Sequence, residues 1–296
     1  MIVLDTAARA RLVDRFGPQV TAWCDGLPAR VNELCDRWGL EVLSAAPGNT
    51  GRTLLCRDAD GASKVLKLTP DTEIAATEAA ALRVWADSRH VVDLLAADGD
   101  ALLLDGIVPG TPLSDADIPY DQVDTMLADL ATFKPRDKAG FTPGDKARFI
   151  PGSKAGFIPL SERVDFMFTL AARRNPDVLA DVQRRSWQRA AELAQGDAAA
   201  LVHGDLHPGN VLWGADGIVV IDPRPSIGDP AVDAVDWALH PLLTGGSLDD
   251  GIAALPSLDG DRVRDWCAAL AVLLALSAIR RGLPAEYTEA LLGVAR

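Results

Sequence analysis

The spacing of hydrophobic positions changes along the first hundred residues, and each change predicts a different kind of element. Between residues 6 and 38, apolar side chains recur every three or four positions, which predicts helix with breaks at Gly17-Pro18 and at Pro28. Short runs rich in apolar residues follow, separated by turns that contain Gly, Asp or Pro. These runs predict strands at 41–45, 53–57, 64–68, 91–96 and 101–104, with an alanine-rich helix at 72–87. We therefore expect a small antiparallel sheet with one inserted helix.

The rest of the chain returns mostly to helical spacing. Asp105-Gly106 and Pro109-Gly110 interrupt the pattern first, so we expect an N-terminal lobe over 1–104 and a C-terminal lobe over 105–296. In the second lobe, Asp229 is the expected N-cap of a helix with proline at its first position. Helices are predicted at 121–133, 162–174, 178–195, 230–240, 261–281 and 284–295. The fold class is thus α+β, with two lobes.

A β-hairpin is predicted within the helical lobe. Two short apolar runs, 211–213 and 218–221, are separated by Gly-Ala-Asp-Gly, which is typical of a hairpin turn. In the register that places Asn210 opposite Ile221, Asp222 leaves the hairpin at the same end as Asn210. The hairpin would therefore bring these two polar side chains together.

The segment before this hairpin carries the most specific chemical pattern. It reads His-Gly-Asp-Leu-His-Pro-Gly-Asn from His203 to Asn210, so Asp205 and Asn210 have the D-x-x-x-x-N spacing of a kinase catalytic loop. In such loops the Asp receives the proton of a substrate hydroxyl and the Asn holds a magnesium ion. Asp222 adds a second carboxylate, and oxygen ligands are those that Mg²⁺ prefers. We expect Asp205 to be the proton acceptor and Asn210 and Asp222 to be metal ligands.

A cation for nucleotide phosphates is expected on the small sheet. Lys67 in Val-Leu-Lys-Leu is similar to the phosphate-binding lysine of a kinase strand, and Lys64 is the competing candidate. Alternation along a strand puts Lys64 and Lys67 on opposite faces, so only one of them can serve. Glu78 on the following helix is the expected ion-pair partner of Lys67, whereas Glu73 is placed to interact with the helix dipole.

The turn at 47–53 is expected to cover the phosphates because it precedes the strand that carries Lys67. It contains Gly48 and Gly51 but is not a G-x-G-x-x-G loop, so the pattern alone is a weak signal.

Two other functions compete with a kinase. His203, Asp205 and His207 could bind the metal of a hydrolase, but the chain has only 4 histidines, and a zinc site usually needs more nitrogen ligands. We therefore expect both histidines to support the loop instead. A nucleotide-binding module without turnover would have no need of the complete set of Asp205, Asn210 and Asp222.

An eight-residue repeat occupies residues 138–161. Each copy contains Lys, Phe and Pro at fixed offsets, and the prolines at 143, 151 and 159 exclude a continuous helix. The simplest interpretation is a duplicated surface loop, and the alternative is a lid whose lysines lie near a bound anion.

Composition limits the partners and the compartment. The formal net charge is −13 and no Lys/Arg-rich run occurs, which disfavours nucleic acid; a cationic ligand or simple solubility would account for the excess of acid. The 4 cysteines lack C-x-x-C spacing, and no signal peptide is recognisable, so a cytoplasmic location is expected. The longest apolar run, 267–279, is too short to span a membrane. Oligomeric state is left open.

Taken together, these residues resemble the aminoglycoside phosphotransferase family. The His-Gly-Asp segment with Asn210, the Ile-Asp-Pro ending at Asp222 and the later Gly-Asp-Pro-Ala-Val-Asp are most similar to its streptomycin kinase and hydroxyurea kinase branch. The resemblance implies a bilobal, protein-kinase-like fold, ATP and Mg²⁺, Lys67 on the phosphates and Leu104 in the nucleotide site. The eight-residue repeat is not a feature of that family.

The resemblance also implies transfer of the ATP γ-phosphate to a hydroxyl group of a small molecule. A streptomycin-like aminoglycoside is the leading acceptor, and hydroxyurea, an amino alcohol or a sugar are the alternatives. A cationic acceptor would need acidic neighbours, for which Asp229, Asp233 and Asp236 are candidates; the first is also a helix cap, and the others could be helix surface.

Overall fold

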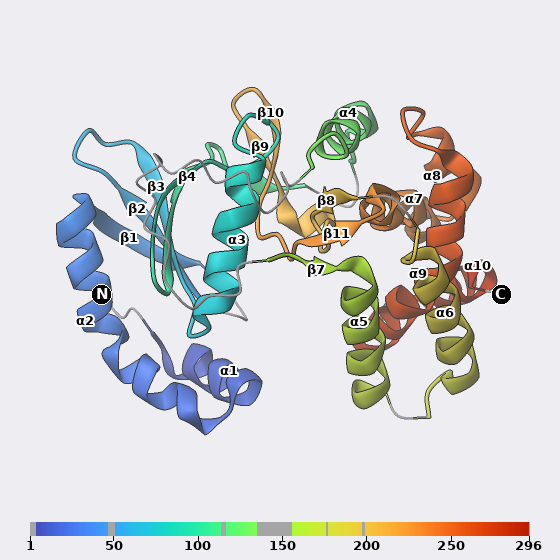
Figure 1. The fold of residues 1–296 in the computed structure, drawn as a ribbon, viewed down its shortest axis with the longest axis horizontal. Helices are drawn as coiled ribbons and strands as arrows, with labels where there is room; N and C mark the ends of the chain where they lie inside the picture. Colours follow the sequence, from blue (N-terminus) through green and yellow to red (C-terminus); the bar gives the residue numbers. More distant parts are fainter. Residues whose placement is uncertain are drawn as a thin grey trace. The chain divides into compact units, whose positions relative to one another are not determined.

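The computed structural model describes residues 4–46, 51–113, 117–134, 156–175, 177–196 and 199–295. The chain forms two compact units, and their described parts are drawn in Figure 1. The first unit contains residues up to 111 together with 213–219, and the second contains most of the remainder. Gly48 and the repeat copies up to residue 155 lie outside the described residues.

A five-stranded antiparallel sheet forms the centre of the first unit (Figure 1). Its spatial order is β1-β2-β3-β5-β4, so the meander β1-β2-β3 lies beside the β4–β5 hairpin, with β3 paired to β5. The alternating pattern predicted these strands to within about three residues of their ends. Their bounds are β1 Glu41–Ala46, β2 Arg52–Arg57, β3 Ser63–Leu68, β4 Leu94–Asp98 and β5 Ala101–Asp105.

The inserted helix α3 (Thr72–Val84) follows β3 and begins at an N-cap. The Asp71 side chain accepts hydrogen bonds from the backbone N–H groups of Glu73 and Ile74, which fixes the start of the helix. The helix ends three residues before the predicted end at residue 87. Its buried face includes Glu78, and a carboxylate is rarely buried in this way without a partner. The partner, Lys67, is described with the candidate active site below.

Two N-terminal helices precede the sheet. Gly17, at φ 83°, ends α1 (Thr6–Phe16) as expected, and a short 3₁₀ segment η1 (Pro18–Val20) leads into α2 (Thr21–Trp38). The predicted break at Pro28 is wrong, because α2 continues through it. The loss of one backbone hydrogen bond is offset by the apolar face of α2, which packs with the sheet residues in one core. That face comprises Leu27, Val31 and Leu34.

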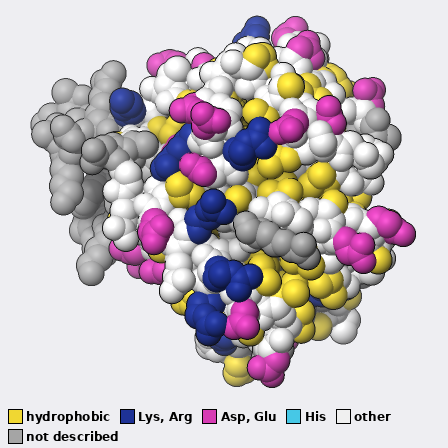
Figure 2. Space-filling view, turned by 90° about the vertical axis from the view of Figure 1, so that its right-hand side faces the viewer, with side chains coloured by type: hydrophobic (Ala, Val, Ile, Leu, Met, Phe, Trp, Pro, Cys, Tyr) yellow, Lys and Arg dark blue, Asp and Glu magenta, His cyan; other side chains and the backbone are white. Residues whose placement is uncertain are grey.

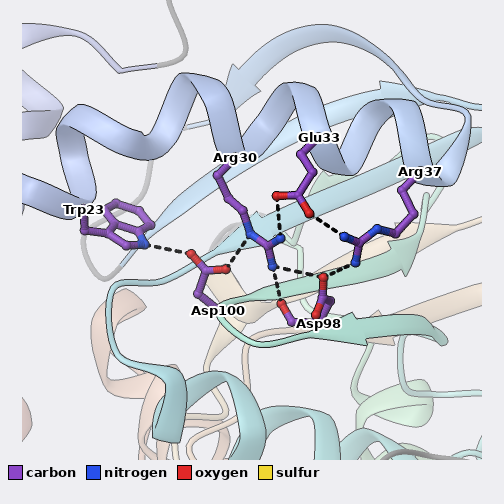
Figure 3. A network of polar contacts seen from close by, with 6 residues as sticks. All are labelled: Trp23, Arg30, Glu33, Arg37, Asp98 and Asp100. Atoms are coloured by element: carbon purple, nitrogen blue, oxygen red, sulfur yellow. Dashed lines mark hydrogen bonds and ion pairs between the residues drawn. The ribbon is translucent and has the colours of Figure 1, made fainter.

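Polar contacts attach α2 to the β4–β5 hairpin, as Figure 3 shows. Arg30 lies at the centre: its Nε donates to Asp100 at 3.1 Å and its Nη2 to Asp98 Oδ2 at 3.1 Å. Trp23 Nε1 donates to the other oxygen of Asp100 at 2.8 Å, and Arg37 pairs with Asp98. A planar guanidinium that bridges two carboxylates fixes the angle at which the helix lies on the hairpin.

The hairpin β9 (Val211–Gly214) and β10 (Gly217–Val220) occurs where the sequence predicted it, with the short β6 (Thr111–Pro112) beside β9. The Ile221 N–H donates to the Asn210 carbonyl at 2.9 Å, so Asn210 lies opposite Ile221 as expected.

A second small sheet, ordered β7-β11-β8, organises the second unit. Strand β11 (Ser226–Gly228) lies between β7 (Ile158–Pro159) and β8 (Ala200–Val202), and pairs parallel with the first and antiparallel with the second. Helix α5 (Leu160–Arg174) starts directly after β7. This sheet therefore fixes where α5 begins relative to the segment that follows β8.

Helices form the rest of the second unit, and α9 packs against α5, α6, α7, α8 and α10 (Figure 1). Trp237, Trp266 and Phe168 are among its largest fully buried side chains, and Phe168 stacks on Trp187 with ring centroids 6.0 Å apart. The helices are α4 Tyr120–Leu130, α6 Ala180–Leu193, α7 Val235–Leu239, α8 Leu248–Ala253, α9 Gly260–Arg281 and α10 Ala285–Val294.

The helix predicted at 230–240 is wrong in its form. The segment consists of a 3₁₀ turn η3 (Pro230–Ala234), the short α7 and a second 3₁₀ turn η4 (His240–Thr244). Pro241 lacks the backbone N–H that would donate to the carbonyl of residue 237, so the α-helical hydrogen bonding ends at α7 although His240 keeps α dihedrals. Helix α8, which begins with a capping box at Ser247 and Asp250, was not predicted.

The surface in Figure 2 carries charges of both signs. Lys and Arg side chains form a column on this face, with Asp and Glu side chains around them and apolar side chains beside them. The net charge of −13 is thus not gathered into a uniformly acidic field here, which favours the solubility interpretation for this face. Among the described helices, none has the length and apolar character needed to cross a membrane.

Candidate active site

The segment after β8 is held by a buried aspartate. Asp233 on η3 accepts hydrogen bonds from the backbone N–H of His203 at 2.6 Å and of Gly204 at 2.8 Å. Burial raises the pKa of Asp233 to about 6, although both backbone hydrogen bonds act to lower it. Asp233 was a candidate for contact with a cationic acceptor, but both its oxygens are committed to the backbone.

His203 braces the segment, as the sequence predicted. Its ring Nε2 lies 3.1 Å from the carbonyl oxygen of Ile221, and its Nδ1 accepts from the N–H of Asp205 at 3.3 Å. Those two contacts require the tautomer with the proton on Nε2. The His203 carbonyl accepts from the N–H of Arg224 at 2.8 Å, so the segment is tied to the chain that follows the hairpin.

Gly204 is the only residue type that fits its position. Its φ is 74°, and a Cβ there would lie 2.3 Å from the carbonyl oxygen of Arg224. The sharp turn it permits leads the chain into Asp205, whose side chain is exposed. An exposed carboxylate on a rigid backbone can receive a proton from a bound hydroxyl.

Asn210 is oriented by the same segment. Its Nδ2 donates to the carbonyl of Asp205 at 2.8 Å, so this contact does not use the side-chain oxygen Oδ1. The 3₁₀ turn η2 (Pro208–Asn210) begins at His207, whose Nδ1 accepts from the Gly209 N–H at 3.1 Å. His207 therefore supports the loop, as expected.

Asp222 follows the hairpin residue that pairs with Asn210, so both side chains emerge at one end of the hairpin. Its φ is 61°, in the left-handed region that Asp and Asn tolerate better than most residues. The amide oxygen of Asn210 and the carboxylate of Asp222 are hard oxygen donors, and such a donor set fits Mg²⁺. No cluster of three or more His, Cys, Asp or Glu residues suited to a metal occurs among the described residues.

In the first unit, Lys67 on β3 and Glu78 on α3 form the predicted ion pair. Lys67 Nζ lies 2.7 Å and 2.6 Å from the two oxygens of Glu78, and the Glu78 side chain is only 2% exposed. Lys64 points to the other face, where it pairs with Asp105 at 2.9 Å and Asp58 at 3.5 Å. Strand alternation thus separates the two lysines, and only Lys67 pairs with the helix.

Two other residues predicted to bind nucleotide lie on the same sheet or at its edge. Gly51 lies so close to β3 that a Cβ there would be 2.2 Å from the carbonyl oxygen of Leu68. Leu104 is buried on β5 opposite Val65. Gly48 falls outside the described residues, and nucleotide contact remains a prediction for Gly48, Gly51 and Leu104.

The other acidic candidates differ from Asp233. Asp229 caps η3 through the Ala231 N–H at 3.0 Å and also accepts from Arg262 and from Trp266, so its role is structural. Asp236 on α7 is half-buried, and among the described residues no hydrogen bond or ion pair engages it. Burial raises the pKa of Asp236 to about 6; the charge of His207 lowers it, and that of Asp205 raises it further.

One neighbour of the predicted catalytic segment, residues 203–210, was missed by sequence reasoning. Arg163 on α5 donates from Nη2 to the carbonyl oxygen of Gly204 at 3.1 Å. In the sequence it is one polar residue on an amphipathic helix, and nothing in its spacing connects it with a segment forty residues away. The β7-β11-β8 sheet brings the two together.

Comparison with known proteins shows which family the chain belongs to. A family model described as aminoglycoside/hydroxyurea antibiotic resistance kinase matches residues 37–282. The chain belongs to this family. The family resemblance noted in the sequence is thereby confirmed, and the protein is a phosphotransferase.

Two curated relatives share a third of their aligned residues with this kinase. A hydroxyurea phosphotransferase from Kitasatospora aureofaciens is 33% identical over 258 residues, covering 82% of this chain and 70% of the relative. A streptomycin 6-kinase from Streptomyces glaucescens is 33% identical over 227 residues, covering 74% of this chain and 68% of the relative. These two relatives act on different acceptors.

Solved structures confirm the protein-kinase-like fold. Choline kinase LicA from Streptococcus pneumoniae has a TM-score of 0.63 at 16% identity, and the alignment covers 91% of this chain and 99% of the LicA chain. Macrolide 2'-phosphotransferase MphH from Brachybacterium faecium has a TM-score of 0.56 at 20% identity, covering 91% and 97%. LicA has also been crystallised in complex with AMP. At such identities the likeness establishes the fold alone.

Proposed function

We propose that this kinase transfers the γ-phosphate of ATP to a hydroxyl of a streptomycin-like aminoglycoside, with Mg²⁺ as cofactor. The observation that carries the proposal is the braced catalytic segment. Its exposed Asp205 carboxylate lies on a backbone fixed by His203 and Asp233, next to the hairpin end that bears Asn210 and Asp222.

The residues have separate roles in this proposal. Asp205 accepts the proton of the acceptor hydroxyl as its oxygen attacks phosphorus. Asn210 Oδ1 and the Asp222 carboxylate hold Mg²⁺, which neutralises charge on the phosphate oxygens. Lys67, oriented by Glu78, contacts the nucleotide phosphates, and Gly51 and Leu104 belong to the nucleotide site.

Asp236 supports a cationic acceptor. The charge of Asp205 raises its pKa, and although His207 offsets part of its charge, it forms no ion pair among the described residues. A guanidinium or ammonium group of the acceptor would neutralise that second carboxylate while its hydroxyl meets Asp205.

Hydroxyurea is the second candidate acceptor. The hydroxyurea phosphotransferase matches more of this chain than the streptomycin 6-kinase does, 82% against 74%, at the same 33% identity. Hydroxyurea is small and uncharged, so Asp236 would have no ionic partner in that complex.

An acceptor panel tests both candidates. The purified protein is incubated with γ-labelled ATP, Mg²⁺ and either streptomycin, hydroxyurea, choline or no acceptor, and labelled product is separated and counted. The proposal expects label on streptomycin above the acceptor-free rate. Label on hydroxyurea alone would replace the leading acceptor with the second, and label on neither would reject both.

A further inference from the structure

The β7-β11-β8 sheet brings Arg163 to the predicted catalytic segment. Helix α5 begins after β7 and the catalytic segment begins after β8, and both strands flank β11. Gly228 on β11 lacks the Cβ that would otherwise lie 2.4 Å from Leu160 Cβ, which allows the start of α5 to approach this closely. Arg163 lies three residues later, within reach of the Gly204 carbonyl.

Gly204 is consequently held from two sides. Asp233 accepts from its N–H at 2.8 Å, and Arg163 donates to its carbonyl oxygen at 3.1 Å. That carbonyl belongs to the peptide group that joins Gly204 to Asp205. Because a peptide group is planar, its orientation determines the direction in which the Asp205 backbone continues.

The charge of Arg163 acts on the surroundings of the Asp205 carboxylate. Among the charged groups that influence it are the carboxylates of Asp205 and Asp233, which attract it, and Arg224, which repels it. Asp205 is also repelled by Asp236, so the arginine counters negative charge gathered around the proton acceptor. The guanidinium carbon also lies 5.7 Å from the centre of the Phe166 ring, which is a cation–π contact.

Arg163 is not an obvious choice for stability. Its Nε is buried, and no hydrogen-bond partner for that atom occurs among the described residues. Burial is also the main reason why the pKa of Arg163 is lowered. A buried N–H without an acceptor and a dehydrated cation both reduce stability relative to an apolar side chain of similar volume. Residues that reduce stability are often retained because activity requires them.

We propose that Arg163 is a positioning residue for phosphoryl transfer. It fixes the peptide group before Asp205 and carries a positive charge that attracts the Asp205 carboxylate, so that this carboxylate stays directed at the acceptor hydroxyl. Arg163 acts through Asp205 and touches neither nucleotide nor acceptor. The inference rests on the proposed function, because it assigns Asp205 the role of proton acceptor.

Three variants of the full chain test this role. Arg163→Met keeps volume but removes the charge and the donors, Arg163→Lys keeps the charge and a donor, and Arg173→Met is the control, since Arg173 is exposed on the last turn of the same helix. For Arg163→Met we expect kcat to fall about 10- to 100-fold, the size of loss that follows from a misplaced catalytic group. Its KM for ATP should not rise, and its melting temperature should not fall. Arg163→Lys should regain most of kcat, and Arg173→Met should match wild type.

Other results would overturn the role. An unchanged kcat in Arg163→Met shows that positioning is not needed. A lower melting temperature, or failure to fold, shows that the residue is structural. Arg163→Lys as inactive as Arg163→Met shows that neither the charge nor a single donor is what matters.

Hydrogen exchange separates this inference from the proposed function. Backbone amides in residues 203–206 should exchange faster in Arg163→Met than in wild type, whereas helix α9 should be unaffected. This result is expected even if no acceptor in the panel is phosphorylated, because it reports only how the segment is held. Unchanged exchange in that segment overturns the positioning role irrespective of activity.

Discussion

At the scale of single residues, the site combines groups that the backbone fixes tightly with groups that it leaves available. Asp229 and Asp233 were both candidates for acceptor contact, yet each has its oxygens committed to protein donors. Asp205 is exposed, and Asp236 has no described partner. The distinction could not be made from sequence, because all four are aspartates near one motif and only their hydrogen bonds differ.

Asp222 allows a test of the metal assignment at constant backbone conformation. Asp222→Asn removes the negative charge but keeps a residue that tolerates the left-handed conformation at φ 61°. We expect the Mg²⁺ concentration needed for half-maximal activity to rise at least about tenfold, because a carboxylate ligand has become neutral. The melting temperature should be retained. Titration of activity with MgCl₂ measures this, and an unchanged magnesium dependence would contradict the assignment.

Asp236 predicts a pH dependence of stability. Its pKa is raised from 3.8 to about 6, so the folded protein retains a proton that the unfolded chain has already lost. The charged form therefore lowers stability progressively as pH rises from about 4 through 6, and Asp236→Asn should remove that penalty. We expect the variant to gain on the order of 1 kcal/mol at pH 8 and little at pH 4.

Thermal melts of wild type and Asp236→Asn across this pH range provide the measurement. Asp265→Asn is the control, because Asp265 is exposed on α9. A gain for Asp236→Asn that is equal at pH 4 and pH 8 would show that burial of the charge is not its cause.

At the scale of elements, strand alternation was the most reliable guide. It predicted the five strands of the first unit and put Lys64 and Lys67 on opposite faces, and the ion pairs confirm that only Lys67 reaches the helix. The position of Glu73 in the first turn of α3 had favoured Glu78 as the partner, and the ion pair confirms that choice as well. Prediction failed where a local rule was overridden by packing. Pro28 should have ended a helix, but the apolar face of α2 is buried along its length.

The pair between Lys67 and Glu78 links β3 to α3 and can be tested by a double-mutant cycle. Lys67→Met alone should destabilise the protein by about 3 kcal/mol, since the carboxylate stays buried after losing its lysine. Adding Glu78→Gln should restore much of that stability without restoring activity, because phosphate contact needs the lysine itself. Denaturant melts and ADP release measure the two effects, and activity in the double variant would refute the role of Lys67.

Arg30 provides a test of how α2 is attached. Arg30→Met removes the contacts to Asp98 and Asp100, and we expect a loss of about 1–3 kcal/mol in the free energy of unfolding. Arg57→Met, which breaks only an exposed pair with Glu41, should cost less than about 1 kcal/mol. Equal losses in the two variants would show that the network of Figure 3 does not hold the helix.

At the scale of the whole molecule, the sequence was sufficient for the fold class and for the family. Asp205, Asn210 and Asp222 are recognisable because their spacing along the chain is itself the signal. Arg163 and the structural role of Asp233 were out of reach, since both arise around a three-stranded sheet whose strands have only two or three residues each. Pairings this short leave almost no periodic pattern in sequence.

Acceptor identity is the property least determined by the fold. Structures at 16% and 20% identity share this architecture although their names specify choline and macrolide substrates. The acceptor must therefore follow from side chains near Asp205, and Asp236 is a candidate because it forms no hydrogen bond or ion pair among the described residues.

The most direct test of the account is transfer of labelled γ-phosphate from ATP to streptomycin by wild type and by Asp205→Asn, with nucleotide affinity measured in parallel. The account predicts transfer by wild type and a loss of about 10²- to 10⁴-fold in the variant, with ATP affinity nearly unchanged, because a general base is lost while the nucleotide contacts remain. Phosphoryl transfer at the wild-type rate by Asp205→Asn would contradict it.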